Sequence, residues 1–415
     1  MVHSGTRLRA REGDSVTRRT DTLSFLPGAT LLLGAAVVQA ALGARVLARF
    51  IGTANGSKVK PAAPDDVAAP CVSIVVPVLN EERRLAPCLD GLTAQGSCVG
   101  EILVVDGGST DKTPDLVKAY AARDGRVKLI DASPVPAHWN GKAWGLQVGL
   151  ERGDPTLPWV LTIDADVRPT PALAAALMAH ARAVHVSALS IATRQDVAGP
   201  GESILHPAFL TTVVYRLGMP GHAVANPRMV QANGQCFLAA RSVLDETGAI
   251  AVARASRCED VTIARVLARA GQAVGFYEGD ALASVKMYEG WREMWCNWPR
   301  SLTLRDQFSG VAGIIGLCEV TLVQALPLPQ AVLLLVYGRS AWATGGGGRA
   351  AWSTATVTAL ILTAARCGVL VGMRRAYRAV EPWYWLSPLC DLPVAAALWR
   401  SLARRSHTWR GRRLV

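Results

Sequence analysis

The sequence predicts an α/β fold with a mostly parallel sheet, flanked by transmembrane helices on its N- and C-terminal sides. In the central part of the chain, short apolar runs alternate with helical patterns, which is typical of a parallel sheet. Acidic residues follow several of these runs, where such sheets bind ligands. Half of the 415 residues are hydrophobic and only 18% are charged, which is too apolar for an ordinary soluble enzyme.

Long apolar stretches mark the membrane segments. Residues 25–44 carry no charge and have close to the ~20 residues that a spanning helix needs. A secretory signal peptide is the alternative, but no clear small-residue cleavage site follows. Further candidates lie at 311–337, 351–373 and 383–399. The last of these contains two prolines and Asp391, which favours a re-entrant or interfacial segment over a spanning one.

These stretches divide the chain into six segments. We expect a basic tail at 1–24, a transmembrane helix at 25–51, a linker at 52–70, an α/β domain at 71–309, a membrane region of two or three helices at 310–400, and a basic tail at 401–415. Of the net charge of +12, residues 374–415 carry +7 and residues 1–24 carry +2. This placement favours anionic headgroups or a cytoplasmic orientation, and no nucleic-acid motif is present.

The nine cysteines are scattered and none has C-x-x-C spacing, which favours reduced thiols in a cytoplasmic domain. The α/β domain is expected to contain strands and helices in alternation, namely strands at 72–78, 101–106, 127–131 and 160–163, with helices at about 82–94 and 113–123 between them.

Four acids follow these strands. They are Glu81, Asp106, Asp164 and Asp166. Because the carboxyl ends of parallel strands share one edge of a sheet, we expect these acids at that edge. Buried carboxylates are costly unless they are paired or bind a cation, so Asp164 and Asp166 are candidate ligands for a divalent ion that clamps a diphosphate. The alternative is a loop with two solvated acids.

Asp106 is a candidate nucleotide contact. It ends an apolar strand and precedes two glycines, which let backbone approach a ligand closely. The alternative is a strand-to-helix turn in which Ser109 or Asp111 caps the next helix. Lys142 lies near an expected helix at 143–150, where a cation suits a phosphate, and the alternative is an exposed loop lysine.

Asp260 is a candidate general base. Glu259 and Asp260 open a helical pattern at 261–270, so Asp260 could take a proton from an acceptor hydroxyl. Acids also suit a helix N-terminus, so simple capping is a serious alternative. Gly234 lies where backbone could approach an acceptor, or it forms a plain turn before a strand at 237–240.

A tryptophan-rich helix is expected after residue 290. Trp291, Trp295 and Trp298 share one helical face and are followed by Arg300. This face either packs on the domain or lies at the membrane surface, and tryptophan favours the interfacial interpretation.

These motifs, in this order, resemble those of family 2 glycosyltransferases with the GT-A fold. The matching residues are Pro77-Val78-Leu79-Asn80-Glu81, Val105-Asp106-Gly107-Gly108-Ser109-Thr110-Asp111, Asp164-Ala165-Asp166 and Glu259-Asp260. The resemblance covers about residues 71–305. A finer resemblance is to membrane-bound carotenoid glucosyltransferases of the chlorobactene type and to hopanoid-associated relatives. It uses Trp139-Asn140-Gly141-Lys142-Ala143-Trp144, Asn233-Gly234-Gln235, Met287-Tyr288-Glu289-Gly290-Trp291 and Thr408-Trp409-Arg410-Gly411-Arg412.

The resemblance implies roles for these residues. The nucleotide sugar would contact Pro77, Asn80, Glu81, Asp106, Lys142, Asp164 and Asp166. The acceptor side would contain Gly234, Gln235, Glu259, Trp298 and Arg300. Asp164 and Asp166 would bind Mg²⁺ or Mn²⁺, and Asp260 would be the base of an inverting transfer. A single acid at Asp106 where the family often has two, and the absence of a Q-x-x-R-W signature before Ser301, are departures from the family pattern.

We therefore expect a multi-pass enzyme of the plasma membrane with a cytoplasmic GT-A domain. It would move a sugar, glucose in the first instance, from a UDP-sugar to a hydroxyl of a lipophilic acceptor such as a carotenoid or another isoprenoid lipid. Three alternatives remain: a polyprenyl-phosphate sugar transferase, a polysaccharide synthase and a non-catalytic membrane scaffold.

Overall fold

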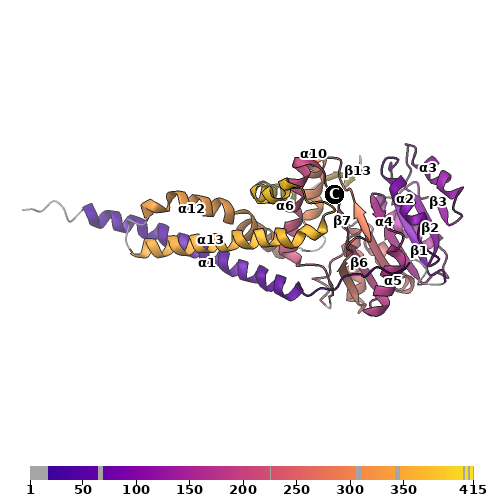
Figure 1. Cartoon of the computed structure of the whole chain (residues 1–415), viewed down its shortest axis with the longest axis horizontal. Helices are drawn as coiled ribbons and strands as arrows, with labels where there is room; N and C mark the ends of the chain where they lie inside the picture. The colour runs from indigo at the N-terminus through magenta and orange to yellow at the C-terminus, as the bar shows by residue number, and fades with distance from the viewer. Residues whose placement is uncertain are drawn as a thin grey trace, which may run out of the picture.

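The computed structural model describes residues 17–63, 69–224, 226–304, 308, 310–341, 346–404, 407–409 and 412–414. The molecule is elongated, with an α/β domain at one end and long helices extending from it (Figure 1). Of the six expected segments, the N-terminal tail differs most, because α1 (Thr17–Thr53) begins inside it. Residues 1–16 lie outside the described residues.

The main sheet has eight strands and is mixed, with a parallel half that matches the expectation. The strand order is β3-β2-β1-β4-β9-β6-β10-β8. The parallel half contains β3 (Val127–Asp131), β2 (Val99–Asp106), β1 (Val72–Val78) and β4 (Trp159–Ile163). The expected bounds of these strands are within two residues of the observed ones.

The other half of the sheet departs from the parallel order. β9 (Cys236–Ala240) is antiparallel to both β4 and β6 (Ala188–Ala192). β10 (Val274–Glu278) is parallel to β6, and β8 (His222–Ala223) is antiparallel to β10. Because β9 enters the sheet from the opposite direction, the loop that precedes it reaches the edge where β4 ends.

Helices cover both faces of the sheet. On one face lie α2 (Leu85–Thr93), α3 (Thr113–Ala121) and α5 (Leu173–Ala183), which pack on alternate residues of β1 such as Ile74 and Val76. On the other lie α4 (Gly141–Arg152), α7 (Arg241–Thr247), α8 (Ala249–Val252) and α9 (Glu259–Arg269), around Val75. The period of two along β1 therefore divides its side chains between two cores.

A small three-stranded sheet lies beside the main one. β5 (Val167–Pro169) pairs with β11 (Ala283–Val285), and β11 pairs with β7 (Arg194–Gln195). Gln195 also forms a β-bridge with Tyr377, which follows the last long helix. The chain after that helix is thus bonded to the α/β domain.

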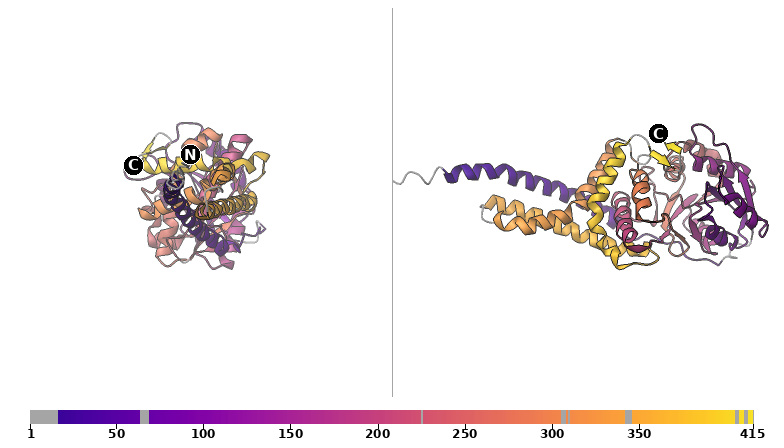
Figure 2. Two further views of the ribbon diagram at one scale, coloured as in Figure 1. Left: turned by 90° about the vertical axis from the view of Figure 1, so that its left-hand side faces the viewer. Right: turned by 90° about the horizontal axis from the view of Figure 1, so that it is seen from above.

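Among the described residues, two helices are long and apolar enough to cross a membrane. They are Gly28–Thr53 of α1 and Gly348–Ala376, which comprises most of α13 (Gly346–Met373) and the short turn η2 (Arg374–Ala376). A bent pair, Val311–Ala325 and Pro327–Gly338, could form a third span; it comprises α11 (Val311–Glu319), η1 (Val320–Ala325) and part of α12 (Pro327–Ala341). α1 and α12 both pack on α13 (Figure 2). Exposed apolar side chains such as Val37 and Ile361 suit contact with lipid.

The expected segment at 383–399 is not one helix of spanning length. It is split between η3 (Pro382–Cys390) and α14 (Asp391–Ala403), and α14 lies across the base of the long helices (Figure 2). Asp391 is buried there and receives two hydrogen bonds from Arg366, at 2.7 and 3.0 Å. A short hairpin, β12 (His407–Trp409) and β13 (Arg412–Leu414), follows.

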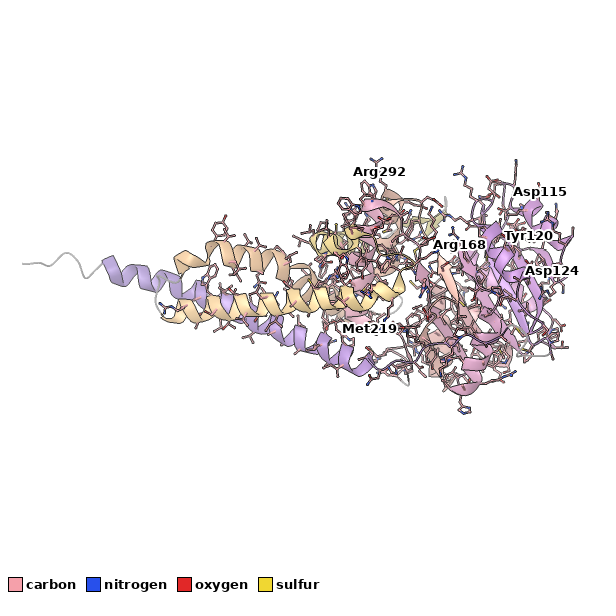
Figure 3. All side chains as sticks on the ribbon, in the orientation of Figure 1. Asp115, Tyr120, Asp124, Arg168, Met219 and Arg292 are labelled. Atoms are coloured by element: carbon pink, nitrogen blue, oxygen red, sulfur yellow. The ribbon has the colours of Figure 1, made fainter. Side chains whose placement is uncertain are left out.

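Two further helices connect the α/β domain to the long helices. α6 (Gly199–Leu217) and α10 (Trp291–Leu302) pack together with η1 and α14 in one apolar cluster. Met219, just beyond α6, lies where the long helices meet the α/β domain (Figure 3). The expected linker at 52–70 is fixed at Val59, which is buried and donates its N–H to Glu278 O at 3.0 Å.

Candidate active site

The four strand-end acids lie at one edge of the main sheet, as expected. β1 is paired with β2 on one side and β4 on the other, all parallel, so the loops that begin at Leu79, Gly107 and Asp164 leave the sheet together. Glu81 follows β1 and is only 9% exposed, and Asp106 is the last residue of β2 and is 8% exposed.

Asp106 organises the turn after β2. Its Oδ1 accepts from the N–H of Ser109 at 2.9 Å and from the Ser109 hydroxyl at 2.6 Å. Asn80, whose φ is +56°, bonds to the same turn, because its Oδ1 accepts from the N–H of Thr110 at 2.8 Å. Asp111 accepts from the N–H of Thr113, the first residue of α3, at 3.0 Å, while the N-cap position itself is Lys112, whose side chain forms no capping hydrogen bond.

Pro77 has a packing role in this geometry. A Cβ built on Gly145 of α4 would lie 3.0 Å from Pro77 Cβ, so α4 packs closely on the end of β1 there. Close packing at this point sets the position of the start of α4, where Asn140 Oδ1 caps the helix by accepting from the N–H of Lys142 at 3.1 Å.

Lys142 forms ion pairs with an acid after β4 and with an acid at the start of α9. Its Nζ lies 2.7 Å from Asp164 Oδ1 and 2.8 Å from Glu259 Oε1, and its side chain is 20% exposed. The alternative of an exposed loop lysine is therefore not what the structure shows. One ammonium group between two carboxylates fixes the distance between the β4 loop and the start of α9.

Asp166 has a buried carboxylate oxygen, Oδ1. Among the described residues, no group bonds to Asp166 Oδ1. Burial, together with the charges of Asp164 and Glu81, raises the pKa of Asp166 to about 7, against the opposing charges of Lys142 and Arg84. A buried carboxylate beside two others is the environment that a hard divalent cation relieves.

The donor set fits such an ion only in part. Within the described residues, no group of three or more His, Cys, Asp or Glu side chains is placed to hold a metal. Mg²⁺ is commonly bound by one or two carboxylates together with the phosphates of a substrate. Asp164 and Asp166 fit that mode, because the open positions would be filled by a diphosphate.

Asp260 faces the loop before β9. Its Oδ2 accepts a 2.6 Å hydrogen bond from the N–H of Gly234. Burial and the charge of Glu259 raise the pKa of Asp260 to about 7, although Lys142 and the hydrogen bonds from the backbone of Val261 and Gly234 act to lower it. A Cβ on Gly234 would lie 2.8 Å from Lys142 Nζ and 3.3 Å from Asp260 Oδ2, so a larger residue here would displace the Lys142 ammonium group.

Gln235 is bonded to the β4 loop. Its main-chain O accepts from the N–H of Asp164 at 3.3 Å, and its side chain is 6% exposed. The loop Asn233-Gly234-Gln235, which we call the 233–235 loop, thus touches Asp164 on one side and Asp260 on the other.

Trp298 and Arg300 differ from the other expected residues. Trp298 is 8% exposed, and its ring lies 4.5 Å from that of His206 and 5.5 Å from that of Phe209, so it belongs to the packed cluster between α6 and α10. The membrane-surface interpretation holds at most for Trp291, which is 48% exposed. Arg300 is partly exposed and lies within electrostatic reach of Tyr288.

Sequence reasoning missed a contact across the site. Arg84 at the start of α2 forms a 3.2 Å ion pair with Glu293 of α10, and Arg84 also acts on Asp166. Burial raises the pKa of Tyr288, which lies in the field of Arg300 and Asp166. The only available signal was the position of Arg84, three residues after Glu81, because nothing local predicts its partner.

Comparisons with known proteins agree with this geometry. The family model "Glycosyl transferase family 2" matches residues 73–247. A PGL/p-HBAD biosynthesis glycosyltransferase of Mycobacterium tuberculosis (strain ATCC 25618 / H37Rv) is 32% identical over 100 residues, which are 24% of this chain and 37% of that protein. The chain thus spans little more than a third of the length of that relative.

Two further proteins are similar over longer stretches. A 4,4'-diaponeurosporenoate glycosyltransferase of Staphylococcus haemolyticus (strain JCSC1435) is 24% identical over 240 residues, which are 56% of this chain and 61% of that protein. The solved structure of a mannosyltransferase from Pyrobaculum calidifontis, in complex with GDP-Man and Mn²⁺, has a TM-score of 0.50 at 19% identity. It covers 90% of this chain and 99% of its own, and it shows that the fold is shared.

Proposed function

We propose that the chain is a family 2 glycosyltransferase, because residues 73–247 match the model of that family. We propose further that it transfers one sugar from a UDP-sugar to a hydroxyl of a lipophilic acceptor, with inversion at the anomeric carbon. We take glucose as the sugar and a carotenoid or another isoprenoid lipid as the acceptor. The observation that carries the proposal is the presence of two kinds of carboxylate at one sheet edge. Asp166 is buried with a raised pKa beside Asp164, which pairs with Lys142, and Asp260 is a second carboxylate with a raised pKa beside the 233–235 loop.

The first pair serves the donor. Asp164 and Asp166 would hold Mg²⁺ or Mn²⁺, which when bound neutralises charge on the departing diphosphate. Lys142 adds a cation at the start of α4, bonded to Asp164 at 2.7 Å. Asp106 and Asn80 hold the turns after β2 and β1, against which we place the uridine.

Asp260 serves the acceptor. Its carboxylate takes the proton of the acceptor hydroxyl while the oxygen forms a bond to the anomeric carbon. The bond from that carbon to the diphosphate breaks, and UDP leaves with the electron pair. A base with a pKa near the working pH combines a useful deprotonated fraction with a useful driving force, and about 7 meets that condition.

The long helices support a lipophilic acceptor. The candidate spans Gly28–Thr53 and Gly348–Ala376 would hold the α/β domain at a membrane surface, where such acceptors partition. The name of the staphylococcal relative refers to a carotenoid acid, which favours the same class. We propose a multi-pass plasma-membrane protein whose α/β domain faces the cytoplasm, since nucleotide sugars are found there.

The test uses the full chain in nanodiscs with UDP-glucose, Mn²⁺ and an isoprenoid lipid extract. Mass spectrometry should detect lipids that carry one added hexose with the wild type, and none with Asp260→Asn. A polymeric product would favour a polysaccharide synthase. Full activity of Asp260→Asn would favour a polyprenyl-phosphate acceptor, which is already ionised and needs no base. GDP-mannose is tested as an alternative donor. A protein that does not bind UDP would contradict the proposal.

A further inference from the structure

Buried polar side chains form a continuous hydrogen-bonded series from the end of α13 to the 233–235 loop. The series consists of Tyr377, His206, Gln195, Thr193 and Gln235, each no more than 8% exposed. Tyr377 Oη lies 2.9 Å from His206 Nδ1, and His206 Nε2 lies 3.2 Å from Gln195 Oε1. Gln195 Nε2 donates to Thr193 Oγ1 at 3.2 Å, and Thr193 Oγ1 donates to Gln235 Oε1. We call these five residues the buried polar series.

The direction of these hydrogen bonds is fixed by a main-chain carbonyl. Gln195 Nε2 also lies 3.0 Å from Thr193 O, which can only accept, so the amide oxygen of Gln195 must face His206. Burial lowers the pKa of His206 to about 3, so its ring is neutral and has one N–H. That N–H must be on Nε2 to meet the amide oxygen, and Nδ1 therefore accepts from Tyr377.

The far end of the series is fixed in the same way. Asn233 Nδ2 donates to Ile191 O at 3.2 Å and to Gln235 Oε1 at 3.1 Å. The oxygen of the Gln235 side chain thus accepts from two donors. On either side of it, Gly234 donates to Asp260, and the Gln235 main-chain O accepts from Asp164.

The near end belongs to the segment that follows a candidate membrane span. Tyr377 comes directly after η2, and its neighbour Arg378 donates its N–H to Gln195 O at 3.0 Å. β7 pairs with β11, and β11 pairs with β5, which begins directly after Asp166. The segment around Tyr377 is therefore also linked to the loop that contains Asp166. The 233–235 loop and the loop that contains Asp164 and Asp166 are therefore both connected to the end of α13.

We propose that Tyr377, His206, Gln195 and Thr193 are positioning residues that hold the 233–235 loop against Asp260. The end of the C-terminal membrane helix thereby sets the geometry of the acceptor side. Such a series fixes the relative positions of the segments it joins, because its buried polar groups are all hydrogen-bonded only in this one arrangement. The catalytic consequence rests on the proposed function, whereas the effect on the loop does not.

The first experiment measures amide hydrogen exchange in the full chain in nanodiscs. Tyr377→Phe removes the first donor, and we expect roughly tenfold faster exchange of the amides at 233–236. Tyr384→Phe is the matched control, since Tyr384 is 1% exposed, contacts the Tyr377 ring and donates to Leu370 O at 2.6 Å, outside the series. It should leave those amides unchanged. Equal exchange at 233–236 in both variants would overturn the proposal.

A second pair of variants tests the middle of the series. Thr193→Val removes the hydroxyl at nearly constant volume, and Thr193→Ser keeps it. We expect Thr193→Val to raise exchange at 233–236 and to lower turnover by roughly tenfold with UDP affinity unchanged, and Thr193→Ser to resemble the wild type. If Thr193→Val and Thr193→Ser behave alike, the proposal is wrong. If the wild type shows no transfer to lipid, the proposed function fails, but the exchange results still decide this inference.

Discussion

The main-chain N–H of Gly234 donates a 2.6 Å hydrogen bond to Asp260 Oδ2, which joins the loop before β9 to the start of α9. Asp260 is the second residue of α9, where capping by an acid is common, yet this hydrogen bond crosses to another part of the chain. The carboxylate is therefore held from two sides, by its own helix and by the 233–235 loop.

Gly234→Ala should abolish most activity without unfolding the protein. The new Cβ would lie 2.8 Å from Lys142 Nζ, so the ion pairs of Lys142 with Asp164 and Glu259 must shift. A misplacement of about 1 Å near the chemistry can cost roughly 10²-fold in rate. Gly125→Ala is the control, because a Cβ there meets nothing within 4 Å. Turnover and circular dichroism of both variants check the prediction, and an active Gly234→Ala would contradict it.

Asp260→Asn should lower turnover by roughly 10²–10⁴-fold with little change in UDP affinity. In the wild type, turnover should fall as the pH drops through about 7, since the raised pKa of Asp260 leaves the base protonated below that value. The variant should lose this acid limb. Asp115→Asn is a control for a first-turn acid, because Asp115 is exposed on α3, far from the long helices (Figure 3). If the product is a sugar joined to a hydroxyl and turnover of Asp260→Asn stays within a few-fold of wild type, Asp260 is only a helix-terminal acid and Glu259 becomes the next candidate for the base.

The local elements could be predicted because each has a local cause. The run at 72–78 is mostly apolar and β-branched, and that at 127–131 contains Val127, Leu129 and Ile130; they form β1 and β3 with the expected bounds. The placement of Glu81, Asp106, Asp164 and Asp166 at one edge follows from the parallel order of strands. A family resemblance then supplies roles that no local pattern contains.

The remaining features depend on contacts between distant residues. The sequence predicts the strand at 237–240, but its antiparallel direction in β9 could not be predicted, because its five residues have no pattern that distinguishes direction. Trp298 lies in a core between α6 and α10, which a helical face with three tryptophans does not distinguish from a membrane surface. The partner of Asp391 is Arg366, 25 residues away on another helix.

Asp166→Asn should abolish metal-dependent UDP binding and leave the fold intact. In EDTA the raised pKa of Asp166 means that the folded state holds its proton more tightly than the unfolded state does. The stabilising contribution is thus complete below about pH 4 and is lost as the pH rises to about 7. We expect the Tm of the wild type in EDTA to fall over this range more than that of Asp166→Asn, and Mn²⁺ with UDP to restore it. Metal-dependent UDP binding by Asp166→Asn would refute the metal role.

The C-terminus should lie on the same side of the membrane as the α/β domain. Tyr377 follows α13 and bonds to His206 of α6, so the loop at 374–378 is on that side, and α14 lies across the base of the helices rather than along them (Figure 2). The end of α1 is on that side too, through Val59. A C-terminal fluorescent reporter on the full chain should therefore report the cytoplasm, and an N-terminal one the opposite side. A C-terminal reporter outside the cytoplasm would exclude the non-spanning arrangement of 383–399.

The pair of Arg366 and Asp391 should be essential as a pair and replaceable as a whole. Both side chains are at most 2% exposed, and Gln324 donates a further hydrogen bond to Asp391 at 2.8 Å. Removal of one partner leaves a buried charge, so Arg366→Met should cost about 3–5 kcal/mol of stability. The double variant Arg366→Met with Asp391→Leu should recover most of that loss, because two apolar side chains can fill the same space. Thermal unfolding in detergent measures both. A double variant no more stable than Arg366→Met would contradict this prediction. It would indicate that Asp391 stabilises the helices through its hydrogen bond with Gln324 rather than through its ion pair with Arg366.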